Sequence, residues 1–426
     1  MFEKVKTSLI VLLEKCEKFF GLDVSYFVRN GFWVFARQLS LVFGGLLIYM
    51  AFARYASQEA LGTYQLVLSI ISVASILSLP GMSPALVQAV VRKMDGTYVE
   101  VFRRSFWGSL LGLLFLLCLG VLLISLGNTF GFLLLIVAPF FPFLSAFTLW
   151  DGFLQGRERF DTIARYSFFL SFFQVASVCG ALFFFQDDAL FSVTFYIIST
   201  SVVHIALFLK SRLLVRNEDV DESSVQFGFF MTKMSGLSII AEQIDKIFIG
   251  FFLGPANLAI YTVVSFFGTR IKDVVRPFGS MLVPKMTLEE AGFSSLLFRH
   301  RKVLFFGLTL AIFCGAIFLF LVERVDFFIF SGKYSEFFKL SRWYAITVVL
   351  SIPLTVIGYY IYAKRNAYAL AVSNTVFYVF RIALNVVSIV FYGLEGAVIS
   401  YNISMAVLLF VYAWGIYQEE VKGRFQ

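Results

Sequence analysis

The chain has 426 residues, of which 59% are hydrophobic, 19% aromatic and 15% charged. Soluble domains have about 45–50% apolar and about 25% charged residues, so this composition excludes a soluble fold. The formal net charge of +8 is distributed in a way that favours lipid headgroups and membrane topology over nucleic acid. The four cysteines are scattered and there are only two histidines, so neither a disulfide framework nor a metal site is indicated.

Residues 1–28 predict an amphipathic helix that lies on the membrane surface. Apolar residues recur at three- and four-residue spacing from Phe2 to Phe19, and charged residues occupy the other faces. A cleaved signal peptide is not expected, because the apolar run Leu9–Leu13 is short and no small-residue cleavage site follows it.

Apolar runs of about 20 residues follow, and each matches the ~30 Å hydrocarbon core of a bilayer. They predict an all-α polytopic membrane protein with twelve transmembrane helices, at 30–53, 60–83, 105–126, 132–153, 163–185, 190–209, 228–253, 257–284, 302–322, 340–362, 367–391 and 394–417. Lys and Arg are concentrated in the segments that are cytoplasmic if the N-terminus is inside. This bias predicts that both termini are cytoplasmic.

The two halves of the chain repeat. Residues 59–67 resemble residues 256–264 at an offset of 197, and Pro80 matches Pro277 at the same offset. Six spans per half in the same orientation imply two lobes related by a pseudo-two-fold axis along the membrane normal. We expect an N-lobe over 29–216 (spans 1–6) and a C-lobe over 217–426 (spans 7–12), around a central cavity.

Charged residues lie inside several predicted spans, where each costs about 3 kcal/mol or more unless it faces protein or water. Trp33 and Arg37 share one face of span 1. The remaining candidates lie in spans 7, 8 and 11, and they are Glu242, Asp245, Lys246, Arg270, Lys272, Asp273, Arg276, Asn374, Arg381 and Asn385. Cations exceed acids in this set, so the pattern predicts a cationic cavity that receives an anion.

These candidates also have structural explanations. Glu242 and Lys246 have the spacing of a helix salt bridge, so they can neutralise each other. Asp245 has no cation four residues away in either direction, so it needs a partner on another helix or a proton. It is therefore an ion-coupling candidate, with a structural ion pair to Arg37 or Arg270 as the alternative. The polar stripe from Asn374 through Arg381 can instead hydrogen-bond neighbouring helices.

Four motifs occur in order along the chain: Leu61-Gly-x-Tyr64, Leu79-Pro-Gly-Met82, Gln155-Gly-Arg-x-Arg159-Phe160 and Gln243-Ile-Asp-Lys246. In this ordered set the chain resembles the MOP (multidrug/oligosaccharidyl-lipid/polysaccharide) superfamily, and within it the Wzx-type polysaccharide flippases. The resemblance implies twelve helices in two bundles around a V-shaped cavity. It also implies movement of undecaprenyl-pyrophosphate-linked oligosaccharide from the inner to the outer leaflet by alternating access.

The expected function is therefore that of a non-enzymatic flippase in the bacterial inner membrane, for an O-antigen (lipopolysaccharide), capsule or similar surface-glycan unit. Its expected partners are the lipid-linked glycan, membrane lipids, and a glycan polymerase or glycosyltransferases of the same pathway. No cofactor is expected beyond an H⁺ or Na⁺ gradient or the membrane potential. The alternatives are a multidrug exporter, which predicts an acidic cavity, and a membrane glycosyltransferase or polymerase.

For this cargo, we expect the cations and their polar neighbours to bind the pyrophosphate and the glycan. These residues are Arg37, Arg270, Lys272, Arg276, Arg381, Trp33, Asn374 and Asn385. We expect ion coupling to involve the acids Asp245, Glu242 and Asp273.

Overall fold

A computed structural model describes residues 24–186, 188–266, 338–363 and 367–423, together with isolated positions between 309 and 324. These described residues are nearly all helical and contain no strand. Seven helical stretches among them are long and apolar enough to cross a membrane. The predicted all-α, multi-pass fold is confirmed. The count of twelve spans includes segments outside the described residues, as does most of the predicted N-terminal amphipathic helix.

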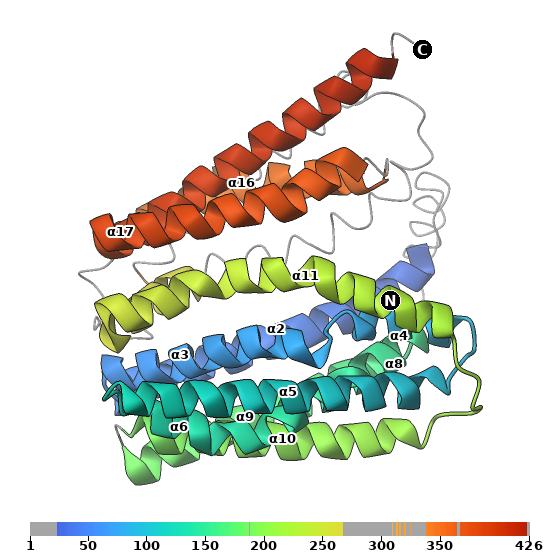
Figure 1. Cartoon of the computed structure of the whole chain (residues 1–426), viewed down its shortest axis with the longest axis horizontal. Coiled ribbons are helices and arrows are strands. Elements are labelled where there is room, and N and C mark those ends of the chain that lie inside the picture. The colour runs from blue at the N-terminus through green and yellow to red at the C-terminus, as the bar shows by residue number, and fades with distance from the viewer. Residues whose placement is uncertain are drawn as a thin grey trace, which may run out of the picture.

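The first half of the chain follows the predicted order of six crossings. They are α2 (Val24–Tyr55), α3 (Gln58–Ala74) with α4 (Met82–Val91), α5 (Thr97–Ser125), the run from α6 to α8 (Phe130–Gly156), α9 (Phe160–Phe185) and α10 (Ala189–Arg212). Figure 1 shows these helices, in blue to green, running side by side along the horizontal axis of the view.

The second predicted span is divided rather than continuous. After α3 the chain forms a 3₁₀ turn, η1 (Ser75–Ser78), and Leu79 then adopts the left-handed conformation with φ 62°. Pro80 follows, and α4 begins at Met82. A proline lacks the amide hydrogen that a continuing helix needs, and it disfavours helical geometry in the residue before it. These two effects explain the break.

The fourth predicted span is also composed of several pieces. α6 (Phe130–Val137), η2 (Ala138–Phe140), α7 (Phe141–Ser145), η3 (Ala146–Leu149) and α8 (Trp150–Gly156) follow one another without a loop. Pro139 and Pro142 lie at the first two junctions, where each interrupts the ladder of helical hydrogen bonds.

The second half begins with α11 (Glu222–Phe248), which continues as a π-helical turn, η4 (Ile249–Leu253). Gly254, with φ 90°, leads into the helix of residues 255–266. α16 (Phe338–Ala363) precedes α17 (Ala367–Gly423), and Gly393 interrupts α17 with φ 59° between the two predicted spans. In Figure 1, α2 begins and α17 ends at the same end of the molecule, as an even number of crossings requires.

Equivalent parts of the two halves contact each other. A Cβ atom on Gly62 would lie 1.7 Å from the carbonyl oxygen of Pro255, so only glycine allows this close approach. Tyr64 and Tyr261, which are separated by the repeat offset of 197, are both buried in the same hydrophobic cluster. The repeated sequence therefore supplies matching components of one core.

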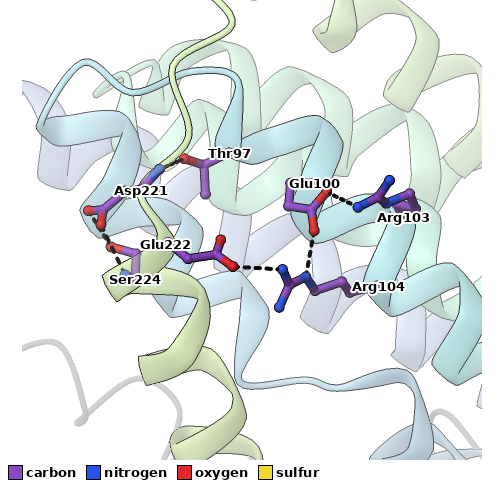
Figure 2. Close-up of polar contacts among 7 residues, drawn as sticks. All are labelled: Thr97, Glu100, Arg103, Arg104, Asp221, Glu222 and Ser224. Carbon is purple, nitrogen blue, oxygen red and sulfur yellow. Dashed lines mark hydrogen bonds and ion pairs between the residues drawn. The ribbon is translucent and has the colours of Figure 1, made fainter.

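A buried acidic residue fixes the connection between α10 and α11. Asp221 is 7% exposed and caps α11, because its carboxylate accepts the Ser224 N–H at 3.1 Å. The same carboxylate pairs with Arg92 at 2.9 Å, and the Asp221 N–H donates to Thr97 Oγ1 at 2.8 Å (Figure 2). Hydrogen bonds from Ser223 and Ser224 hold the pKa of Asp221 below its ordinary value.

A second buried carboxylate holds the same connection. Asp95 pairs with Arg157 and accepts the Arg216 N–H at 2.9 Å. Its own N–H donates to Asn217 Oδ1 at 2.9 Å. Asp95 and Asp221 together tie the chain before α11 to the start of α5, and they fix the predicted cytoplasmic end of α11 against the first half.

Asp221→Ala is expected to lower the free energy of unfolding by about 2 kcal/mol, because it removes the α11 cap and leaves Arg92 unpaired. Asp221→Asn keeps a capping oxygen, so it is expected to cost less. Because the folded state lowers the pKa of Asp221, its stabilisation is present above about pH 4 and is lost as the pH falls further. Thermal unfolding of the purified chain in lipid nanodiscs measures these differences. Exposed Asp219→Ala is the control, and equal melting temperatures for all three variants would contradict the proposed clamp.

Candidate functional site

A polar cluster lies inside the second half of the chain, where four helices meet. This C-lobe cluster consists of Asp245 on α11, Tyr261 on the helix of residues 255–266, Tyr344 on α16, and Arg381 and Tyr401 on α17. Asp245 is only 4% exposed and Arg381 only 8%. All five residues lie within about 18 Å along their helices of the same predicted outer end, at a rise of ~1.5 Å per residue.

Asp245 is held by hydrogen bonds. Its Oδ2 accepts a bond from the Tyr261 hydroxyl, and its Oδ1 accepts the Lys246 N–H at 2.8 Å. Tyr344 shares a further hydrogen bond with Tyr261. The partner on another helix that the sequence required is therefore Tyr261, while Arg37 pairs elsewhere and Arg270 lies outside the described residues.

Arg381 is a buried cation with spare hydrogen-bonding capacity. Its guanidinium lies 4.5 Å from the centre of the Tyr401 ring, and the carboxylates of Asp245 and Glu242 act on it electrostatically. Its Nε is buried without a hydrogen-bond partner among the described residues. A buried donor of this kind is costly unless a partner arrives, so Arg381 can receive an anion.

The other candidates in this half are placed differently. Asn385 accepts a hydrogen bond from Ser400 across the break in α17, as the interhelical explanation expects. Its Nδ2, however, is buried without a partner in the described part of the chain. Lys246 donates to Gln243 at 3.1 Å, and no salt bridge joins it to Glu242 within the described residues. The side chain of Asn374 lies outside the described set.

Arg37 and Trp33 lie in the first half and have partners there. Arg37 forms an ion pair with Asp151 at 2.8 Å, and these two side chains are 34% and 30% exposed. The guanidinium of Arg165 lies 5.9 Å from the centre of the Trp33 ring. Asp151 was missed in the sequence analysis, although an acid inside the predicted fourth span was itself a signal.

The first half contains a neutral counterpart of the C-lobe cluster. Gln174 donates to Tyr196 and Thr200, each at 3.2 Å, and Tyr64 is hydrogen-bonded to Tyr196. Tyr64 precedes Tyr261 by the repeat offset of 197. Similar positions in the two halves therefore carry a neutral network in one and a charged network in the other.

The described candidates comprise three cations, Arg37, Lys246 and Arg381, and two acids, Asp245 and Glu242. Asp151, the ion-pair partner of Arg37, adds a third acid, so the charges then balance. The other four charged candidates lie outside the described residues and are Arg270, Lys272, Asp273 and Arg276. The predicted excess of positive charge therefore depends on the eighth span.

Solved transporters have a similar fold. The chain is similar to the lipid II flippase MurJ in an inward closed conformation, with a TM-score of 0.69 and 15% identity over 92% of this chain and 87% of that one. It is also similar to an inward-facing multidrug resistance MATE family transporter of the MOP superfamily, with a TM-score of 0.60 and 13% identity over 91% and 98% of the two chains.

A MOP superfamily transporter from Pyrococcus furiosus, whose binding pocket is described as having reverse polarity, matches with a TM-score of 0.60. Its identity is 13% over 92% of this chain and 95% of that chain. These similarities, together with the apolar spans, define the class as a multi-pass membrane protein with the fold of MOP transporters.

The family follows from the sequence. The Polysacc_synt family model, described as polysaccharide biosynthesis protein, matches residues 27–288, which is more than half of the chain. No curated protein matches the chain. The chain belongs to the polysaccharide biosynthesis protein family, and the resemblance inferred from its motifs is confirmed.

Tyr261→Phe is expected to destabilise the protein by about 1.5–3 kcal/mol, because it removes a hydrogen bond to a buried carboxylate. Tyr64→Phe, at the equivalent position of the neutral network, is the matched control with an expected cost of about 0.5–1.5 kcal/mol. Thermal unfolding of both variants in nanodiscs measures the difference. An equal or smaller loss for Tyr261→Phe would show that Asp245 does not depend on the hydroxyl.

The pairing of Arg37 with Asp151 can be separated from a role in binding. If Arg37 only neutralises Asp151, the double variant is expected to recover the protein level and activity that Arg37→Ala and Asp151→Ala each lose, since it leaves no charge unpaired. If Arg37 binds cargo, activity is expected to stay lost in the double variant while protein levels recover. Surface-glycan display and membrane abundance distinguish the two results.

Proposed function

We propose that this protein is a flippase that moves undecaprenyl-pyrophosphate-linked oligosaccharide from the inner to the outer leaflet of a bacterial inner membrane. Family membership supports a place in polysaccharide biosynthesis, and the fold supports alternating access between two lobes. The cargo is transported without covalent change, so the protein is proposed to be a transporter rather than an enzyme.

The observation that carries this proposal is the buried Arg381. Its Nε faces no hydrogen-bond acceptor among the described residues, although a charge inside the bilayer costs about 3 kcal/mol or more when it is unmatched. A pyrophosphate supplies acceptor oxygens and negative charge, and a guanidinium binds such oxygens bidentately. The cations of the eighth span, Arg270, Lys272 and Arg276, are proposed to complete the anion site.

Asp245 is proposed to couple transport to an H⁺ or Na⁺ gradient or to the membrane potential. It lies beside Tyr261 and within electrostatic range of Arg381, so its charge state affects the cation that we assign to the cargo. Glu242 acts on Arg381 as well, and Asp273 is the third acid assigned to coupling. In this proposal, binding and release of the pyrophosphate are linked to the charge of these acids.

Replacing Arg270, Arg276 or Arg381 by Ala is expected to abolish flipping while membrane levels stay normal, because each change removes a cation from the anion site. The assay is complementation of a deletion strain, with lipid-linked glycan on the inner leaflet and glycan at the cell surface as readouts. Exposed Arg159→Ala is the matched control. Wild-type display in all three variants would contradict a cationic binding site.

A multidrug exporter is the second candidate, favoured by the similarity to MATE transporters over 91% of this chain. It requires an acidic cavity for cationic drugs. The deletion strain then becomes sensitive to such drugs and keeps its surface glycan, which is the opposite of the result expected here.

A further inference from the structure

A groove opens on the side of the molecule between α5, η1 and α11. It has a volume of about 780 Å³, and its walls are mainly apolar, with Leu77 and Leu79 at the helix break, Leu111 on α5 and Phe229 on α11. Its walls therefore come from both halves of the chain. None of the residues assigned to the proposed cargo site lines it.

The helix break in the second span forms the floor of this groove. The 3₁₀ turn η1 and the left-handed Leu79 lie against α5, and Leu77 and Leu79 line the groove there. Gly108 allows α5 to approach the break, because a Cβ atom there would lie 2.3 Å from the Leu77 carbonyl oxygen. Residues at the break before Pro80 therefore form part of the groove wall.

The exposed face of α5 places the groove in the membrane. Arg103, Trp107 and Leu111 follow one another at four-residue spacing, and all three are exposed. From the headgroups into the hydrocarbon, membrane proteins typically present cations first, then interfacial aromatic residues, and then aliphatic residues. The charged end of the groove therefore lies at the headgroups of the predicted cytoplasmic leaflet, and the apolar end lies among acyl chains.

The charged end of the groove presents one exposed guanidinium, that of Arg103. Glu100 pairs with Arg103 at 2.7 Å and with Arg104 at 2.6 Å, as Figure 2 shows. Arg104 also pairs with Glu222 at 2.9 Å, whereas Glu100 is the one carboxylate paired with Arg103 among the described residues. The side chain of Arg103 is 68% exposed and keeps donors free for a further acceptor.

We propose that this groove binds one anionic phospholipid of the cytoplasmic leaflet. The diester phosphate binds the exposed guanidinium of Arg103, which keeps donors free, and the acyl chains lie between Leu111, the helix break and Phe229. Because Phe229 belongs to α11 and the other walls to the first half, the bound lipid bridges the two halves. It reinforces the Arg104–Glu222 ion pair that joins the same helices at 2.9 Å.

Native mass spectrometry of the purified full chain tests this site, with phosphatidylglycerol and phosphatidylcholine of identical acyl chains as probes. Wild type is expected to bind one phosphatidylglycerol more tightly than phosphatidylcholine. Arg103→Gln is expected to weaken phosphatidylglycerol binding about fivefold, as loss of one cation near a phosphate implies. Leu111→Trp fills the groove and is expected to remove binding of this lipid while the arginines remain.

Arg159→Gln, which removes an exposed cation outside the groove, is expected to leave binding unchanged. Equal affinity for the two lipids, unchanged binding in Arg103→Gln and Leu111→Trp, or an equal loss in Arg159→Gln would overturn the proposal. Polyprenyl diphosphate is the competing occupant. If it displaces phosphatidylglycerol one for one in wild type, the groove holds a cargo lipid and the proposal is wrong. The proposed flippase activity remains open under any of these results.

Discussion

The absence of hydrogen-bonding solvent inside a bilayer is the constraint that organises this protein. Every polar group placed in the apolar spans must find its partner within the protein or in a bound molecule. Asp245 meets this requirement through Tyr261, and Asn385 meets it in part through Ser400. Arg381 meets it only in part, since its Nε stays without a partner in the described residues. Among the described residues, the site that we assign to the cargo contains a buried charged side chain that satisfies this constraint only in part.

The two halves use equivalent buried positions differently in the described part of the chain. Tyr64 and Tyr261 occupy equivalent buried positions, but one belongs to a neutral network with Tyr196 and the other bonds a carboxylate. The two tyrosine networks thus differ in charge.

The helices were predictable from the sequence because a bilayer demands long apolar runs, and the break at Gly393 fell between the two spans assigned there. The partners of the charged residues were not predictable. Asp151 lies 114 positions from Arg37, and Tyr261 lies on the helix that follows Asp245 across a reversal of the chain. Helical spacing reports neighbours on one helix only, so contacts between helices require the fold. The same reason hid the two carboxylates that hold the connection before α11.

Transport of the cargo itself tests the account most directly. Purified full-length protein is reconstituted into liposomes with a fluorescent polyprenyl-diphosphate glycan, and its movement between leaflets is followed by quenching from outside. We expect movement that requires the protein and that slows strongly when the diphosphate is replaced by a neutral linkage. Equal rates with and without the protein, or equal rates for the neutral lipid, would contradict recognition of the cargo through its phosphates.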